Sequence, residues 1–179
     1  MGRINLLYMV FLLPTDTCYG LAWELCEQDF QDIYRLKGRD FSKRLAFLVR
    51  DFDSLREYTD ITDVQINFLK TYPHPWSVVL RKKSTWSIPY YLDEKEYENI
   101  SFRVAEKCIP ANIRNSIRYP LFLTSANLSG KSESKTLIEA RESFPQVDGI
   151  DGWICDRPPS DIFTFWEGVD ILYFRKNSK

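Results

Sequence analysis

Residues 6–20 read Leu6-Leu7-Tyr8-Met9-Val10-Phe11-Leu12-Leu13-Pro14-Thr15-Asp16-Thr17-Cys18-Tyr19-Gly20, an unbroken apolar run that passes directly into a tight polar loop. A short apolar run ending in turn residues is typical of a strand buried on both faces, as at the centre of a sheet. Residues 4–13 are therefore predicted to form a central strand. Because ligands in open α/β sheets bind in the crevice outside the strand ends, the polar loop that follows is a candidate site.

The same apolar run, preceded by Arg3, resembles the start of a signal peptide. It is too short to span a membrane, which takes about twenty residues. No small-residue cleavage site follows it. We therefore expect a cytoplasmic protein with no membrane partner.

The composition is that of a globular domain, with 44% hydrophobic and 27% charged residues among 179. A net charge of −1 provides no overall basic field, so any polyanion would need a local patch. The cysteines form no CxxC pair and are interpreted as reduced thiols. His74 is the single histidine, which excludes a zinc site built on several histidines, and its place between two prolines indicates a turn.

Helices and strands alternate along the rest of the sequence, and strands gather near its end. This order predicts an α/β fold, in which residues 1–179 form a single domain with a mixed, twisted sheet flanked by helices. The predicted helices are 28–37, 53–71, 111–118 and 136–144, and the predicted strands are 46–49, 77–81, 100–105, 121–124, 153–155, 161–166 and 170–174.

Two of these segments carry more detailed predictions. In 53–71, Thr62 is a plausible N-cap. The turn Glu167-Gly168 is expected to close a terminal hairpin between 161–166 and 170–174. The residues of 53–71 that are predicted to face inward are Val64, Phe68 and Leu69.

Two polar clusters lie in the first part of the chain. In the loop 14–20, two threonine hydroxyls and the Asp16 carboxylate could bind a small polar ligand or could cap their own backbone. Around Lys37-Gly38-Arg39 and Lys43-Arg44, four cations could hold a triphosphate, or could simply reflect the preference of basic residues for a helix C-terminus. No Walker lysine motif is present.

Two further clusters follow. Arg103 is centred in the apolar segment 100–104, so its charge requires an anionic partner, either a structural carboxylate or a ligand carboxylate. Residues 123–130, Leu123-Thr124-Ser125-Ala126-Asn127-Leu128-Ser129-Gly130, run from a buried strand into a turn with more hydrogen-bonding groups than a cap requires.

Taken in order, these clusters resemble the YrdC family of threonylcarbamoyl-AMP synthases. The family pattern P-T-[DE]-T-x-Y-G-L is matched at 14–21, and I-x-x-x-K-G-R at 33–39. Its V-x-V-R strand is matched by Phe102-Arg103, and S-x-N-x-S-G is matched without change at 125–130. A segment that usually reads P-G-P-[FWY]-T appears as Pro73-His74-Pro75-Trp76-Ser77. The resemblance covers residues 10–176.

The resemblance implies a YrdC-like (YrdC/RibB) fold and the activity of an L-threonylcarbamoyladenylate synthase. This nucleotidyltransferase makes threonylcarbamoyl-AMP and pyrophosphate from L-threonine, bicarbonate and ATP, and a downstream threonylcarbamoyl transferase complex uses the product to modify tRNA. Such chemistry needs positioning and charge neutralisation more than acid–base groups. Mg²⁺ is expected to be carried by the ATP phosphates, so no metal ligands of the protein are predicted.

By similarity, a set of residues is assigned to each substrate and to catalysis. Threonine would be bound by Thr17, Tyr19, Arg103, Ser125 and Ser160. ATP would be bound by Lys37, Arg39, Lys43, Asn127, Thr136 and Arg175. The catalytic residues would be Lys37, Arg39, Ser125 and Asn127.

The sequence also departs from the family pattern. Lys43-Arg44-Leu45 lacks the proline of K-P-L or N-P-L, and Leu48 stands near a position that often holds a threonine-contacting histidine. Ser160-Asp161-Ile162-Phe163-Thr164 replaces S-T-[VI]-[VI]-D, and an acid there would repel phosphates unless it points away or binds metal. A helix before the first strand is also expected to be absent.

These departures leave two alternatives open. One is a paralogue that binds nucleotide and acts on another carboxylated or carbamoylated substrate. The other is a non-catalytic module that binds double-stranded RNA, against which the near-neutral charge counts. A weak direct contact with tRNA or double-stranded RNA is a further expectation.

Overall fold

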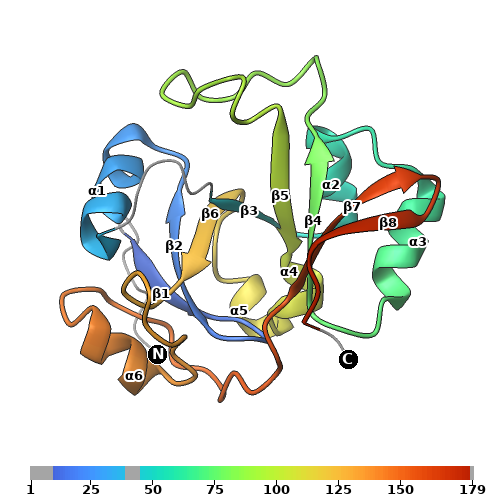
Figure 1. The fold of residues 1–179 in the computed structure, drawn as a ribbon. Coiled ribbons are helices and arrows are strands. Elements are labelled where there is room, and N and C mark those ends of the chain that lie inside the picture. Colours follow the sequence, from blue (N-terminus) through green and yellow to red (C-terminus); the bar gives the residue numbers. More distant parts are fainter. Residues whose placement is uncertain (1–9, 39–44, 178–179) are drawn as a thin grey trace.

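The computed structural model describes residues 10–38 and 45–177. Its strands form one mixed sheet in the order β1-β2-β6-β3-β5-β4-β7-β8 (Figure 1). The pairs β3–β5 and β4–β7 are parallel, and the remaining neighbours are antiparallel. The strands are β1 (Phe11–Pro14), β2 (Tyr19–Glu24), β3 (Ala46–Val49), β4 (Trp76–Arg81), β5 (Asn99–Val104), β6 (Leu121–Ser125), β7 (Asp161–Glu167) and β8 (Asp170–Arg175).

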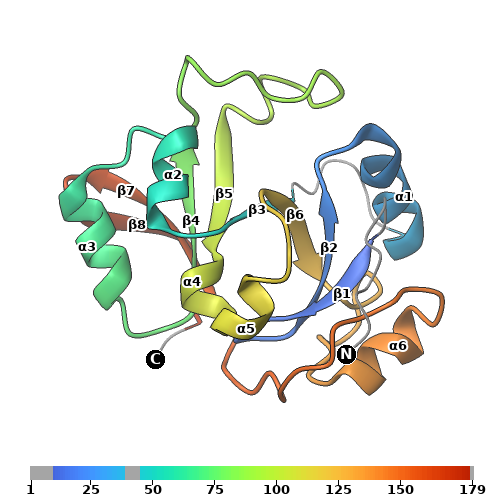
Figure 2. The same cartoon turned by 180° about the vertical axis from the view of Figure 1, so that it is seen from behind.

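Helices flank this sheet, which confirms the predicted α/β architecture. Helix α1 packs beside β2, α2 beside β3, α4 beside β5 and α6 beside β1 (Figures 1 and 2). None of the helices in the described part of the chain has the length and apolar character that a membrane crossing requires. The helices are α1 (Glu27–Lys37), α2 (Phe52–Tyr58), α3 (Asp63–Thr71), α4 (Ala105–Cys108), α5 (Ala111–Arg114) and α6 (Leu137–Ser143).

The two faces of the sheet are filled differently, because successive side chains of a strand point to opposite faces. In β5, Ile100 and Phe102 enter a large aromatic core, which also receives side chains from α1, α2 and α3. On the opposite face, a smaller cluster packs against α4 and α5 and includes Leu48 of β3. Ser101 and Arg103 of β5 also lie on this second face, where they line a cavity.

The first strand differs from its prediction. β1 begins at Phe11 and lies at the edge of the sheet, so the predicted central position is wrong; the part of the predicted strand before residue 10 lies outside the described residues. Leu12 is nevertheless fully buried, because a backbone segment covers the edge. The Leu12 N–H donates to the carbonyl of Asp148 at 2.7 Å, and its carbonyl accepts from Ile150 at 2.9 Å. An apolar run therefore reports burial here, not a central position.

The predicted helix 53–71 is two helices. Thr62 caps α3 through a capping box with Gln65, as its residue type predicts, but Thr59 before it is extended and ends α2. Of the residues predicted to face inward, Leu69 is fully buried and Phe68 packs against the aromatic core. Val64 is 63% exposed, so that prediction is wrong.

Three other segments are corrected. α5 ends at Arg114, well before the predicted end of 111–118. Residues 153–155 form no strand, although the Cys155 N–H donates to the carbonyl of Lys135 at 2.9 Å. β2 was not predicted. The terminal hairpin is confirmed, with Gly168 in its turn at a φ of 55°.

Candidate functional site

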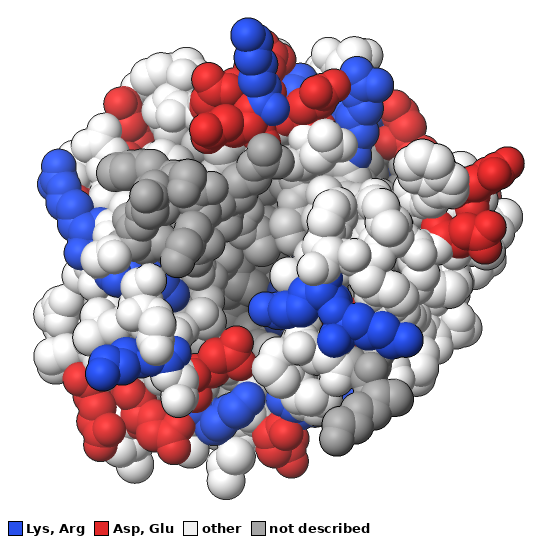
Figure 3. All heavy atoms as spheres, viewed as in Figure 1, with Lys and Arg blue, Asp and Glu red and all other residues white. Residues whose placement is uncertain are grey.

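A cavity of about 390 Å³ lies on the second face of the sheet, within the range of about 300–1,000 Å³ that is typical of small-molecule sites. The surface in Figure 3 is hollowed near its centre, and acidic and basic side chains are interspersed around it. Strand alternation brings side chains from β4, β5, β6 and β8 to one cavity. Its polar lining includes Thr17, Ser77, Arg103, Ser125, Ser160 and Arg175.

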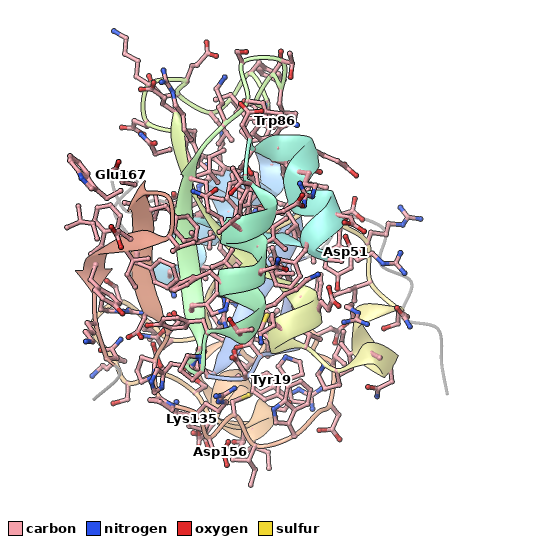
Figure 4. All side chains as sticks on the ribbon, turned by 90° about the vertical axis from the view of Figure 1, so that its right-hand side faces the viewer. Tyr19, Asp51, Trp86, Lys135, Asp156 and Glu167 are labelled. Carbon is pink, nitrogen blue, oxygen red and sulfur yellow. The ribbon has the colours of Figure 1, made fainter. Side chains whose placement is uncertain are left out.

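The polar loop between β1 and β2 both caps itself and contributes to the cavity. The Thr15 hydroxyl donates to the Cys18 carbonyl at 2.7 Å, so it stabilises the turn. Thr17 lines the cavity, and its carbonyl accepts from Lys135 Nζ at 2.6 Å. Figure 4 places Lys135 close to Tyr19, at the opposite end of the molecule from Trp86. The structural and ligand-binding interpretations of this loop are therefore compatible.

Arg103 is the charged group most deeply set in the cavity wall, at 7% exposed. Its Nη2 lies 2.5 Å from Asp16 Oδ1, and its Nη1 donates to Thr17 Oγ1 at 3.4 Å. Within the described residues its buried Nε–H has no hydrogen-bond partner. The guanidinium thus has a structural carboxylate and retains an unmet donor for an anionic ligand.

The charge of Arg103 is maintained despite its burial. Burial lowers the pKa of Arg103, but nearby Cys108 and Asp16 raise it by more, so that the net pKa is above its ordinary value. Of these two groups Asp16 supplies the negative charge at neutral pH, because burial raises the pKa of the Cys108 thiol to about 12. A permanently charged guanidinium at this position suits recognition of a carboxylate.

Lys37 connects the end of α1 with the polar turn that follows β6. It is the last residue of α1, which ends at Gly38 in a left-handed conformation (φ 56°). Lys37 is 4% exposed; its Nζ donates to the Ser125 carbonyl and lies 3.4 Å from Thr124 Oγ1. The helix end therefore places a buried cation beside the end of β6, where Ser125 lines the cavity.

Four described residues that were assigned by similarity lie outside the cavity lining: Lys37, Tyr19, Asn127 and Thr136. The Asn127 side chain donates to the carbonyls of Leu128 and Lys131, at 3.1 and 2.7 Å, and closes its own turn. Thr136 caps α6 by accepting from the Glu139 N–H. The Tyr19 hydroxyl points toward the carbonyl of Ile150 at 3.5 Å, and burial raises its pKa to about 12. Arg39 and Lys43 lie outside the described residues.

The C-terminal hairpin contributes the opposite wall. Arg175 donates through Nε and Nη2 to the Ser160 carbonyl, at 3.1 and 2.8 Å, and through Nη2 to Ser160 Oγ at 3.2 Å. The neighbouring Asp161 faces away from the cavity, where Tyr72 and Asn177 bind it. Among the described residues, no group of three or more histidine, cysteine, aspartate and glutamate side chains could hold a metal ion.

Ala46 and Ser77 also line the cavity, whereas Leu48 does not. Leu48 lies fully buried in the apolar cluster, and Ala46 is the β3 side chain that reaches the cavity. Ser77, which the sequence analysis assigned no role, lines the cavity with its hydroxyl 3.4 Å from that of Ser160. Its alternation with buried Val78 in β4 is a signal that could have identified it.

The chain is similar to known proteins in sequence and in fold. Residues 9–172 match the Sua5/YciO/YrdC family, whose description reads "Telomere recombination". A protein of Methanocaldococcus jannaschii, provisionally named a threonylcarbamoyl-AMP synthase, is 34% identical over 144 residues, which cover 79% of this chain and 66% of the relative.

Two solved structures share the fold. E. coli YciO has a TM-score of 0.74 at 19% identity, covering 94% of this chain and 83% of that one. P. abyssi Sua5, solved in complex with L-threonine, has a TM-score of 0.71 at 20% identity, covering 93% of this chain and 49% of that one. The chain thus spans about two thirds of the archaeal relative and about half of Sua5. The match over residues 9–172 shows that the chain belongs to the Sua5/YciO/YrdC family.

Proposed function

We propose that this chain is an L-threonylcarbamoyladenylate synthase, which converts L-threonine, bicarbonate and ATP to threonylcarbamoyl-AMP, pyrophosphate and water. The observation that carries the proposal is the buried Arg103, held by Asp16 in the wall of a cavity sized for a small molecule. The name of the archaeal relative and the threonine complex of Sua5 support the same substrate class.

Threonine would bind through its carboxylate to Arg103, where the Nε–H has no partner among the described residues. Arginine binds carboxylates through paired N–H donors, which fixes orientation as well as charge. The hydroxyls of Thr17, Ser125 and Ser160 line the same cavity and would bind the rest of the amino acid. Tyr19 faces the opposite side and would support the loop rather than touch threonine.

ATP would bind between the end of α1 and the C-terminal hairpin. Arg175 lines the cavity, and Lys37 lies beside Ser125, so cations approach it from both sides. Arg39, Lys43, Asn127 and Thr136 remain proposals by similarity. Mg²⁺ would enter as part of the nucleotide substrate, bound mainly by phosphate oxygens.

The proposed reaction proceeds in two steps. The threonine nitrogen first bonds to the carbon of bicarbonate, and water leaves, forming a carbamate. A carbamate oxygen then bonds to the α-phosphorus of ATP while the bond to pyrophosphate breaks. Fixed cations such as Lys37 and Arg175 would stabilise the charge that develops on the phosphates. Transfer of the product to tRNA by a separate complex, and a cytoplasmic location, belong to the same proposal.

Two features weigh against the alternatives. Leu48 lies in the apolar cluster and Asp161 on the opposite face, and neither is among the residues that line the cavity. This supports threonine over another substrate. Among the described residues on the face in Figure 3, acidic and basic side chains are interspersed, which disfavours binding of double-stranded RNA but is compatible with a weak tRNA contact.

The test is pyrophosphate release from ATP in the presence of bicarbonate, with and without L-threonine. We expect release that depends on threonine, with serine and valine as matched amino acid controls that share only part of its side chain. Tight ATP binding without threonine-dependent release would contradict the proposal and favour a paralogue with another substrate.

A further inference from the structure

A second pocket of about 250 Å³ lies beside the cavity, and Arg103 is the residue that lines both. It is lined by the connection between α3 and β4, by the end of α4, and by Asp16 and Arg157. Figure 1 shows the α3–β4 connection and α4 at the same end of the molecule. This volume is below the roughly 300–1,000 Å³ of sites for larger ligands, so it suits a small ion.

The lining of this pocket is strongly basic. Its one carboxylate among the described lining residues, Asp16, is already paired with Arg103 at 2.5 Å. The described lining contains no further acidic residue to balance the remaining basic side chains, so the local electrostatic potential favours an anion. The basic lining residues are Lys70, His74, Arg103, Lys107 and Arg157.

Two of these cations are fixed by the pocket's own backbone. Lys107 Nζ donates to the Lys70 carbonyl at 2.8 Å, and Arg157 Nη2 donates to the Pro73 carbonyl at 3.0 Å. A lysine has three N–H donors and an arginine five, so each retains donors for a ligand. Their tethering reduces the conformational entropy that binding would otherwise cost.

Arg103 adds its charge to the pocket as well as to the cavity, because it lines both. Its Nε–H, unpartnered among the described residues, is a single donor, which the proposed function assigns to threonine, so the oxyanion in the pocket would be bound by the other cations.

We propose that this pocket is a binding site for a small inorganic oxyanion of the phosphate or bicarbonate type, separate from the cavity. Such an ion presents several acceptor oxygens, which match the fork of Arg157 and the ammonium of Lys107. His74 contributes an imidazole to the same lining.

The test is calorimetric titration of the full chain with inorganic phosphate and, separately, with bicarbonate at low salt. Arg157→Ala and Lys107→Ala should each weaken binding by about tenfold, because each removes a charged donor. Arg118→Ala is the matched control, because this arginine is 84% exposed and lies outside the pocket. The variant should bind the anion with unchanged affinity. The anion that binds more tightly identifies the physiological class.

Binding in the cavity must be distinguished from binding in the pocket. Arg175→Ala removes a cation of the cavity alone, so a pocket-bound anion should keep its affinity in this variant. Loss of binding in Arg175→Ala but not in Arg157→Ala or Lys107→Ala would overturn the proposal, as would binding of neither anion at millimolar concentration. If Arg157→Ala fails to fold, Lys107→Ala and the charge-conserving Arg157→Lys carry the test, and the latter should retain more affinity than Lys107→Ala.

Discussion

The carboxylate of Asp161 accepts a hydrogen bond from the Tyr72 hydroxyl at 2.7 Å, on the face of the sheet opposite the cavity. Asp161 is 1% exposed, and the backbone N–H of Asn177 also donates to it at 2.6 Å. Its neighbours Ser160 and Ile162 line the cavity. The acid is therefore a structural acceptor that holds the end of the chain to β7, and it does not face the proposed phosphates.

Asp161→Asn should accordingly destabilise the fold and leave ATP binding intact. We expect the free energy of unfolding to fall by about 1–3 kcal/mol, because a charged acceptor of two buried bonds is weakened. The KM for ATP should change by less than about twofold. Urea unfolding and steady-state kinetics measure the two effects, with Asp170→Asn, at an exposed end of β8, as control. A markedly lower KM for ATP would mean that the carboxylate does repel the nucleotide.

Arg103→Lys should separate the two substrates. The lysine keeps the positive charge but lacks the fork that reaches Asp16, Thr17 and a ligand carboxylate together. The KM for threonine should rise at least about tenfold, while the KM for ATP changes little. Arg118→Lys, an exposed pair partner of Glu24, is the control. An equal rise in both constants would argue that Arg103 supports the cavity without recognising threonine.

Lys37→Met should slow turnover. The substitution keeps the length of the side chain but removes the ammonium that binds the Ser125 carbonyl and lies beside Thr124. Pyrophosphate release should fall by at least about tenfold, and the free energy of unfolding by about 1–3 kcal/mol, because a buried carbonyl loses its donor. Lys95→Met, on an exposed loop, controls for the loss of a surface charge. Loss of stability with unchanged turnover would assign Lys37 a purely structural role.

Alkaline pH should destabilise the protein. Burial raises the pKa of Cys108 and of Cys155 to about 12, from an ordinary value of 9.0. Between these values the unfolded chain loses thiol protons that the folded chain retains, so the stabilisation is complete below pH 9 and is lost as pH rises toward 12. Urea midpoints measured from pH 8 to 11 should fall. The double variant Cys108→Ala/Cys155→Ala should show a shallower fall, and an unchanged slope would contradict this cause.

Local signals predicted the elements that depend on local interactions. The capping box at Thr62 and the turn at Gly168 are encoded by adjacent residues, and both are confirmed. β2 was missed because it begins inside a segment that reads as loop, and its pairing with β6 joins distant residues. There Gly20 lies opposite Ser125, and a Cβ on Gly20 would approach Leu123 Cδ1 to 2.6 Å. Such a requirement is visible only in the folded sheet.

The candidate site was predicted in part. The motifs identified Thr17, Arg103 and Ser125, because polar residues interrupting apolar strands are conspicuous, and all three line the cavity. The motifs did not reveal to which face of the sheet each side chain points. Tyr19 has a polar tip but projects into the other face, and Asp161 does the same because its strand begins one residue after the cavity-lining Ser160.

The ion pair of Arg103 and Asp16 joins residues 87 positions apart, and the Ser77 and Ser160 hydroxyls meet across 83. On a translating ribosome, the strands made first must therefore wait for the last hairpin before the cavity has its second wall. At about 5–20 residues per second, synthesis from the first strand to Arg175 takes about ten to thirty seconds. During that time the nascent chain exposes apolar strand faces, and its dependence on chaperones should be greatest before Arg175 emerges from the exit tunnel.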